Sequence, residues 1–293
     1  MSFIPTSKQA QMQALKSKLS SLNDELSFAG GTVAVTDDFF DQRETINSSC
    51  SRHGDFSQMR IWTEYKGRVS EKLSRCPQCI AEDKAAVEVE IKQHKVADLL
   101  DRAHISERFA ECSFDNYQPV NQRASRNLSM LKTYVENWPA MYTEGTSLIM
   151  SGKPGTGKNH LAVALAKAII QQHQASVLLT SVLRIIRAVR RTWGKDSEYT
   201  EDEIMAIYTD VDLLVIDEIG VQYSSNSEMI TLFEIINCRY ERKLPTVMIS
   251  NLSPVEMSAA IGDRLTDRMV EGDGATLVFD WDSYRGTKGA KEV

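Results

Sequence analysis

The residues with the clearest chemical meaning form a glycine-rich segment, GKPGTGKN, at positions 152–159. It follows an apolar run, SLIMS, and precedes a helix-favouring run, HLAVALAKAII. A strand, a glycine-rich loop and a helix in this order build an anion cradle, because backbone N–H groups and the helix N-terminus surround a phosphate. The segment therefore predicts a nucleotide-phosphate site made by Gly152, Lys153, Pro154, Gly155, Thr156, Gly157, Lys158, Asn159 and His160.

Two residues of this segment have individual roles. Lys158 can reach the β- and γ-phosphates as a point charge. Asn159 stands where such loops usually carry Ser or Thr. Its amide oxygen is not the usual hydroxyl, but it is an oxygen ligand that can serve Mg²⁺ directly or through water.

A second group of candidate residues ends the run LLVIDE, at positions 213–218. An apolar strand that ends in acids delivers carboxylates to the edge of the sheet where ligands bind. We expect Asp217 to hold Mg²⁺ and its waters, and Glu218 to orient the attacking water. An apolar run before two acids is a weak signal alone, and the glycine-rich segment upstream makes it a strong one.

Further polar residues extend this site toward the C-terminus. Asn251 follows the run TVMIS, where it either positions water or senses the γ-phosphate, or simply forms a turn. Arg264 and Arg268 are four residues apart on a predicted helix, and Arg285 follows in WDSYRG. Arginines can stabilise the transition state of phosphoryl transfer, but pairing with nearby aspartates on a solvated face would produce the same sequence.

A separate set of residues has the spacing of a metal site. Two short pairs, CxxH and CxxC, are separated by 22 residues and comprise Cys50, His53, Cys76 and Cys79. Three thiolates and one imidazole can close a tetrahedral zinc site, and a site with all four positions filled is structural. The segment between the pairs has β-hairpin character, with Trp62 and Tyr65 available for a small core.

Composition limits the class of protein. The 293 residues have a net charge of −6, so any nucleic-acid binding must use a local basic patch. Such a patch is predicted on a helix at 181–193, through Arg184, Arg187, Arg190 and Arg191, although an ordinary solvated face is the alternative. Five cysteines, no signal-peptide pattern and no long apolar run predict a cytoplasmic protein without a membrane span.

The remaining pattern predicts the elements that position these residues. Apolar runs that alternate with helical stretches from residue 112 onward predict an α/β fold with a mostly parallel sheet. An apolar seam along residues 8–27 predicts a helix that either docks on its own module or binds a partner. We expect an N-terminal helix and zinc module at 1–80, a helical linker at 81–111 and the phosphate-binding domain at 112–293.

Three stretches together, SGKPGTGKNHLA, LLVIDEIGVQ and FDWDSYRG, resemble the DnaC-type helicase loaders. These are AAA+ ATPases related to the replication initiator, and the resemblance covers about residues 112–293. It implies a P-loop AAA+ domain that binds ATP and Mg²⁺. It also implies a primosome protein that brings the hexameric replicative helicase onto single-stranded DNA, with ATP state controlling release.

The resemblance also implies a role for each matching residue. Lys158 is then the Walker A lysine, and Asp217 and Glu218 form Walker B. Asn251 is the first sensor, and Arg264 is a finger that acts on a neighbour's nucleotide, with Arg268 beside it. Arg285 senses nucleotide within its own subunit. A finger that acts in trans implies self-association on the helicase ring, and the helix at 181–193 lies where this family contacts DNA.

The N-terminal half matches this family poorly. Phage or prophage loaders with a zinc-containing N-terminus would fit the layout, and we expect this part to bind the helicase. A transposition-helper ATPase that binds DNA and a transposase is the main alternative, and GKNH and WDSYR favour the loader. A P-loop small-molecule kinase and a nucleotide-binding scaffold are less well supported, because no arginine-rich lid follows the loop and both Walker B acids are present.

Overall fold

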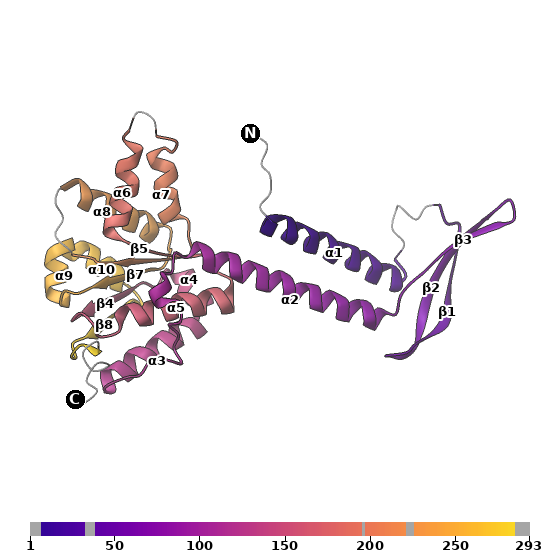
Figure 1. Ribbon diagram of the computed structural model, residues 1–293, viewed down its shortest axis with the longest axis horizontal. Coiled ribbons are helices and arrows are strands. Elements are labelled where there is room, and N and C mark those ends of the chain that lie inside the picture. The colour runs from indigo at the N-terminus through magenta and orange to yellow at the C-terminus, as the bar shows by residue number, and fades with distance from the viewer. Residues whose placement is uncertain (1–6, 33–38, 195–196, 221–225, 285–293) are drawn as a thin grey trace, which may run out of the picture. The chain divides into compact units, whose positions relative to one another are not determined.

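The computed structural model describes residues 7–32, 39–194, 197–220 and 226–284 (Figure 1). Its contacts divide the chain into two compact units, an N-terminal unit, Met1–Lys95, and a C-terminal unit, Val96–Val293. Helix α2 begins in the first unit and ends in the second. Within the described ranges, no helix has the length and apolar character that crossing a lipid bilayer requires.

The N-terminal unit contains two helices that pack through the predicted seam. Helix α1 spans Ser7–Ala29, and α2 spans Pro77–Arg102. Leu22 on α1 is buried in a cluster with Ile80 and Val87 on α2. The seam of α1 therefore docks on its own unit, as the simpler of the two expectations predicted.

The same unit contains an antiparallel sheet of three strands in the order β1-β2-β3. These strands are β1, Gln42–Cys50, β2, Gly54–Tyr65, and β3, Arg68–Leu73, so the predicted hairpin is present. Its small core differs from the expectation, because Tyr65 is 67% exposed and Ile61 is buried instead. Side chains alternate between the faces of a strand, so Ile61 and Tyr65 would share a face, but Tyr65 lies beside the turn that joins β2 to β3, at the exposed tip of the hairpin.

The C-terminal unit is an α/β domain around a parallel sheet of five strands. The strand order is β5-β6-β7-β4-β8, and every pairing is parallel. The strands are β4, Leu148–Gly152, β5, Val177–Ser181, β6, Leu213–Asp217, β7, Thr246–Ser250, and β8, Ala275–Phe279. Each corresponds to one of the apolar runs, so the predicted fold class is confirmed.

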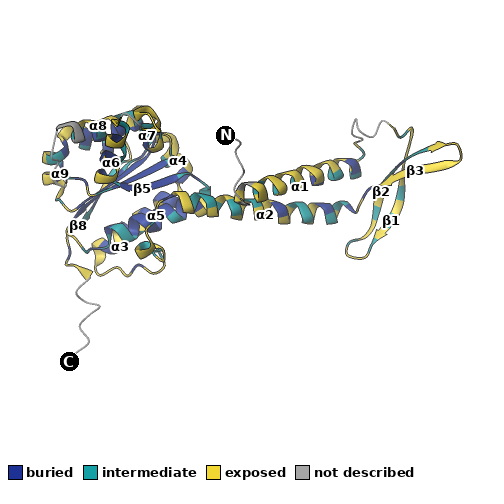
Figure 2. Ribbon diagram, turned by 45° about the horizontal axis from the view of Figure 1, so that its top comes forward, coloured by how far each residue is buried: buried dark blue, intermediate teal, exposed yellow. Residues whose placement is uncertain are grey.

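Helices cover both faces of this sheet, and Figure 2 shows its strands in the dark blue of buried residues. Leu148 and Met150 pack on one face with the helices α3, Gln122–Glu136, α4, Trp138–Glu144, and α5, Lys158–His173. Ile149 belongs to the cluster on the other face. The helices there are α6, Val182–Thr192, α7, Glu201–Thr209, α8, Asn226–Glu241, α9, Pro254–Ile261, and α10, Asp263–Val270. A short helix, η2, spans Glu107–Phe109 before α3.

A buried arginine, Arg239 on α8, ties several of these elements together. Its side chain is 0% exposed, and desolvation lowers its pKa to about 10. The guanidinium donates to the Thr246 hydroxyl and to the carbonyls of Tyr208, Val211, Asp212 and Pro245. Tyr208 lies near the end of α7 and the other acceptors lie just before or at the starts of β6 and β7, so one side chain aligns the two strands that carry candidate site residues.

Replacing Arg239 with methionine should destabilise the C-terminal unit. The substitution fills similar volume but leaves buried carbonyls without donors, which should lower the free energy of unfolding by about 3 kcal/mol. Urea denaturation followed by circular dichroism measures the change. The control, Arg242→Met, removes a half-exposed guanidinium that pairs with Asp210 and donates to the carbonyl of Thr209, and it should cost less than about 1 kcal/mol. Equal stability of the two variants would contradict the role of Arg239.

Candidate nucleotide-binding site

The glycine-rich segment forms a loop between β4 and α5, as predicted. Gly157 caps the N-terminus of α5 with φ of 97°, and a Cβ there would lie 2.8 Å from Cε2 of Tyr117. Glycine is therefore required by both conformation and space. Lys158 folds back along the loop, and its ammonium donates to the carbonyls of Gly152 and Lys153 at 2.7 Å each. The ammonium group of Lys158 is thus bound by carbonyls of its own loop.

The two predicted metal-binding residues are in direct contact. The amide nitrogen of Asn159 donates to Oδ2 of Asp217 at 2.6 Å, and the backbone N–H of Glu218 donates to Oδ1 at 2.7 Å. Because the amide nitrogen of Asn159 is used by Asp217, the amide oxygen is the atom that can serve a metal or its water. This donor set of carboxylate and amide oxygens fits Mg²⁺.

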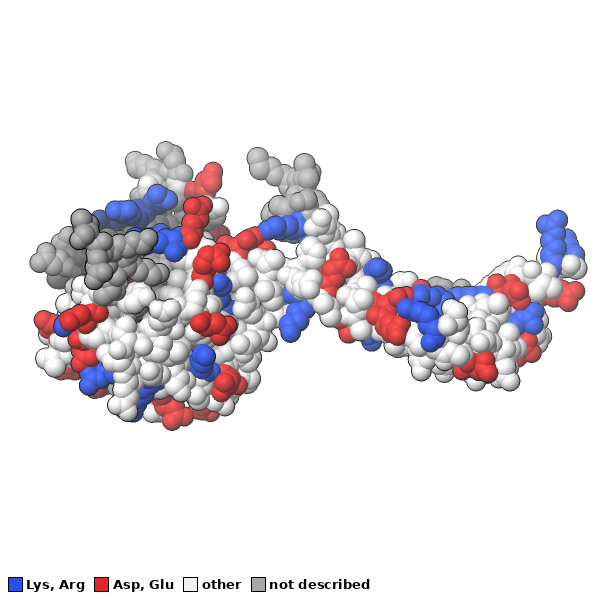
Figure 3. Space-filling view, turned by 60° about the horizontal axis from the view of Figure 1, so that its bottom comes forward, with Lys and Arg blue, Asp and Glu red and all other residues white. Residues whose placement is uncertain are grey.

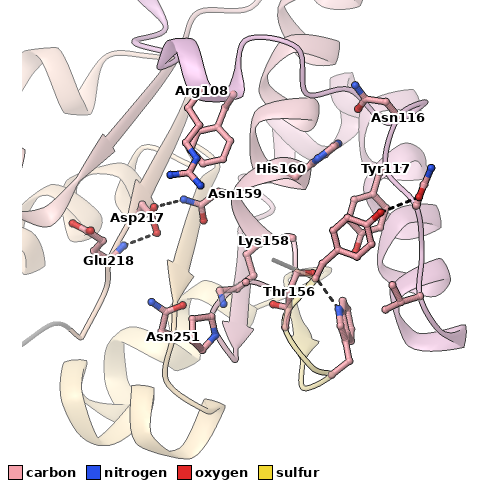
Figure 4. A pocket seen from close by; sticks show the side chains of 18 residues that line it. Arg108, Asn116, Tyr117, Thr156, Lys158, Asn159, His160, Asp217, Glu218 and Asn251 are labelled. Atoms are coloured by element: carbon pink, nitrogen blue, oxygen red, sulfur yellow. Dashed lines mark hydrogen bonds between the residues drawn. The ribbon is translucent and has the colours of Figure 1, made fainter. Parts of the chain in front are cut away.

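Glu218 has an unusual backbone. Its φ is 63°, in the left-handed region that residues other than glycine seldom adopt. Such conformations are retained where the surrounding structure requires them, and they concentrate at functional sites. Here the turn after β6 gives Glu218 a place on the pocket wall, beside Asp217 (Figure 4).

These groups surround one cavity of about 800 Å³. Its size is within the range of small-molecule and cofactor sites, about 300–1,000 Å³. Ten of its lining residues are predicted site residues: Pro154, Gly155, Thr156, Gly157, Lys158, Asn159, His160, Asp217, Glu218 and Asn251. Strands β4, β6 and β7 deliver them to the same edge of the sheet.

Gly152 and Lys153 do not line the cavity and instead secure the base of the loop. A Cβ on Gly152 would lie 2.2 Å from the carbonyl oxygen of Phe279, so the close approach of β8 requires glycine. The backbone N–H of Lys153 donates to the same carbonyl at 2.8 Å, and its ammonium lies 3.3 Å from Asp282.

Two of the predicted arginines, Arg264 and Arg268, also lie apart from the cavity lining. Arg264 is exposed on α10, while Arg268 lies over the ring of Tyr240 at 4.8 Å and donates to Asn237. Arg285 is outside the described residues.

Sequence reasoning missed a segment that forms another wall of the cavity. Arg108, Phe109, Asn116, Tyr117, Gln118 and Val120 line it from the region before α3. His160 attaches this segment to α5, because its Nε2 donates to the carbonyl of Ser113 at 2.9 Å. The ring of Tyr117 packs edge-on to His160, and burial raises the pKa of Tyr117 to about 12. Its hydroxyl therefore stays protonated at neutral pH.

The residues after β8 form a strap over the loop. The indole of Trp281 donates to the carbonyl of Thr156 at 3.1 Å, and the backbone N–H of Tyr284 donates to that of Gly155 at 3.0 Å. The hydroxyl of Tyr284 donates to the side chain of Gln118 at 3.0 Å. The WDSY stretch therefore contacts both the phosphate-binding loop and the segment before α3.

The predicted basic helix corresponds to α6. Its apolar residues Val182, Ile185, Ile186 and Val189 are buried, and its four arginines Arg184, Arg187, Arg190 and Arg191 are exposed. Exposed Leu183 and Trp193 accompany them. On the face that Figure 3 shows, acidic and basic side chains are interspersed within each unit. Any nucleic-acid surface is therefore local.

The predicted metal ligands converge in the N-terminal unit. The ligand atoms of Cys50, His53, Cys76 and Cys79 all lie within 4.8 Å of one another. Nδ1 of His53 is 3.4 to 3.7 Å from the three sulfurs. Ligands about 2.3 Å from a tetrahedral zinc ion would lie roughly 3.8 Å apart, so the four atoms fit this ion. Nε2 of His53 is 2.9 Å from Oε1 of Glu82, the outer contact that orients metal-bound imidazoles.

Comparisons with known proteins agree with this geometry. The family model of IstB-like ATP-binding proteins matches residues 82–287. The replicative helicase loader DnaC of Buchnera aphidicola subsp. Acyrthosiphon pisum is 37% identical over 224 residues, 76% of this chain and 84% of that protein. The replicative helicase loader DnaC of Escherichia coli K12 is 38% identical over 208 residues, 71% of this chain and 83% of that protein.

Solved structures show the same fold. The crystal structure of a DnaC helicase loader matches with a TM-score of 0.51 and 24% identity, over 60% of this chain and 100% of that one. The family match covers the loop, Asp217, Glu218 and Asn251 in one continuous span. The chain therefore belongs to the IstB-like family of ATP-binding proteins, as a DnaC-type AAA+ P-loop ATPase.

Proposed function

We propose that this protein binds the replicative DNA helicase and delivers it onto single-stranded DNA during replication initiation, with release controlled by ATP state. The observation that carries this proposal is 37–38% identity to replicative helicase loaders over more than four-fifths of their length. The pocket supports it, because a loader that responds to ATP needs a complete phosphate site. Lys158, Asp217 and Glu218 all line that site.

In this proposal ATP occupies the cavity with its phosphates in the loop between β4 and α5. Lys158 leaves the loop carbonyls to contact the β- and γ-phosphates. Asp217 and Asn159 hold Mg²⁺, which neutralises charge on the phosphates. Glu218 orients the attacking water, and Asn251, at the end of β7, senses the γ-phosphate.

Other residues would link hydrolysis to assembly and DNA. Arg264 is exposed and remote from its own cavity, a placement that suits a finger acting on a neighbour's nucleotide on the helicase ring. Arg268 lies beside Arg264 on α10, and Arg285 is proposed to sense nucleotide within its own subunit. The exposed arginines of α6, with Trp193 nearby, suit contact with phosphates and bases of a single strand.

We assign the zinc module to helicase binding and propose the division into residues 1–80, 81–111 and 112–293. Four filled ligand positions give zinc a structural role there, because no position remains for a reacting water. A primosome role in a phage or prophage would fit this layout.

A transposition helper that binds DNA and a transposase remains the second candidate, since the matching family model is IstB-like. The two functions differ in partner. The full chain, mixed separately with a candidate replicative helicase and a transposase, should co-purify with the helicase, and capture of the transposase alone would support the helper.

Replacing Lys158 with alanine should remove ATP binding and, with it, ATP control of the helicase complex. Loss of a charged contact to phosphate should weaken affinity by roughly 100-fold, measured by titration with a fluorescent ATP analogue. Lys132→Ala on α3, outside the cavity, is the matched control. Wild-type affinity in Lys158→Ala would refute the phosphate-site assignment.

Replacing Arg264 with alanine should leave ATP binding by the free chain unchanged but slow hydrolysis in the assembly. Fingers contribute about 10³-fold or more in well-studied ATPases and GTPases, so a reduction of at least tenfold is expected here. ATP turnover is measured with and without helicase and DNA. An unchanged rate in the complete assembly would exclude the finger role.

The purified protein should contain about one zinc ion per chain, measured by elemental mass spectrometry. Cys79→Ser should lose most of this zinc and melt at a lower temperature, because metal binding stabilises the small unit that holds it. Cys112→Ser, which alters a cysteine outside the cluster, should retain both properties. Wild-type protein prepared in zinc-containing medium yet free of metal would overturn the zinc assignment.

A further inference from the structure

The cavity contains a second strong cation besides Lys158. Arg108 on η2 lines it, and its guanidinium points into the cavity toward Asn159 and Asp217 (Figure 4). Across the described residues, Arg108 has no hydrogen bond or ion pair. It therefore offers unused N–H groups at the site where a polyphosphate is expected.

Three other arginines of the C-terminal unit are in ion pairs with acidic side chains. Pairs are formed by Arg102 with Asp98, Arg123 with Asp280, and Arg242 with Asp210. Arg108 faces Asp217 across the cavity without pairing with it. This arrangement suits a metal–phosphate ligand, because the cation can meet the carboxylate of Asp217 while the phosphate oxygens accept from the guanidinium of Arg108.

The segment that carries Arg108 is fastened to α5. Lys167 donates to the carbonyl of Ala110 at 2.6 Å, and His160 donates to that of Ser113 at 2.9 Å. Asn116 adds a local clasp, because its side chain accepts from the N–H of Ser113 and donates to the carbonyl of Glu111. The helix whose N-terminus forms the phosphate cradle therefore also holds the backbone beside Arg108 in place.

We propose that Arg108 binds the phosphates of the nucleotide held by its own chain. Guanidinium groups donate two parallel N–H bonds to phosphate oxygens, and such charge-assisted bonds are among the strongest in proteins. The proposal rests on the proposed nucleotide site and adds a cation that acts in cis. It differs in this respect from Arg264, which is assigned to a neighbour's nucleotide.

The proposal also gives His160 and Lys167 a positioning role. Neither side chain needs to contact ATP to matter, because both hold the backbone from which Arg108 extends. His160 lies directly after the phosphate-binding loop. Through this hydrogen bond, a substitution of His160 would also affect the segment about 50 residues upstream.

The test compares Arg108→Ala, Arg108→Lys and a matched control, Arg126→Ala, in the full chain. Arg126 is an exposed arginine of α3 outside the cavity lining. Affinity for Mg·ATP and Mg·ADP is measured by titration, and the melting temperature is measured with and without ATP. Arg108→Ala should lose about tenfold or more in ATP affinity, and Arg108→Lys should retain part of it. Arg126→Ala should match wild type.

Two readouts separate phosphate binding from a structural role. Without nucleotide, Arg108→Ala should melt at the wild-type temperature, and only its ATP-induced rise should shrink. Wild-type ATP affinity in Arg108→Ala would overturn the proposal, as would a lower melting temperature in the absence of nucleotide. If neither wild type nor Lys158→Ala binds ATP, the proposed nucleotide site is wrong. If Lys158→Ala loses ATP affinity and Arg108→Ala does not, the nucleotide site stands and only the role of Arg108 is rejected.

Discussion

The site depends on one constraint, which is that the parallel sheet is buried on both faces. Helices cover each face, so a ligand can reach the strands only at an edge. In the strand order β5-β6-β7-β4-β8, the strands that end in Asp217, Asn251 and the phosphate-binding loop are consecutive neighbours. Residues about 100 positions apart therefore meet at the carboxyl edge because of topology.

Short polar contacts then convert this arrangement into a defined cavity. The Asn159–Asp217 bond joins the loop to β6, and Arg239 aligns the starts of β6 and β7 from the opposite ends of the strands. The Trp281–Tyr284 strap closes the other side of the loop. Asn159 thus does more than replace a hydroxyl. Its amide nitrogen holds the carboxylate of Asp217, and its amide oxygen remains available to a metal ion or its water.

Prediction from sequence succeeded where local pattern and structure coincide. Short apolar runs identified the five strands of the C-terminal sheet, and the CxxH and CxxC pairs identified four side chains that converge as candidate metal ligands. Strand β1 was missed because its sequence, QRETINSSC, is polar and mostly exposed. Arg108 and Tyr117 were missed because only the tertiary fold brings them to the cavity wall, and CSFDNYQP, which contains Tyr117, signals no more than a turn. The exposure of Tyr65 likewise reflects its position at a hairpin end.

Trp281 gives the molecule an internal optical reporter. Its indole is 9% exposed, packs at 5.1 Å from the ring of Phe279, and donates to a carbonyl of the phosphate-binding loop. Indole emission depends on such hydrogen bonds and on the surrounding polarity, so a shift of the loop changes the spectrum without any label. The chain has three other tryptophans, Trp62, Trp138 and Trp193, so replacing these with phenylalanine isolates the signal of Trp281. A chain that keeps Trp281 alone can therefore report occupancy of the loop in real time.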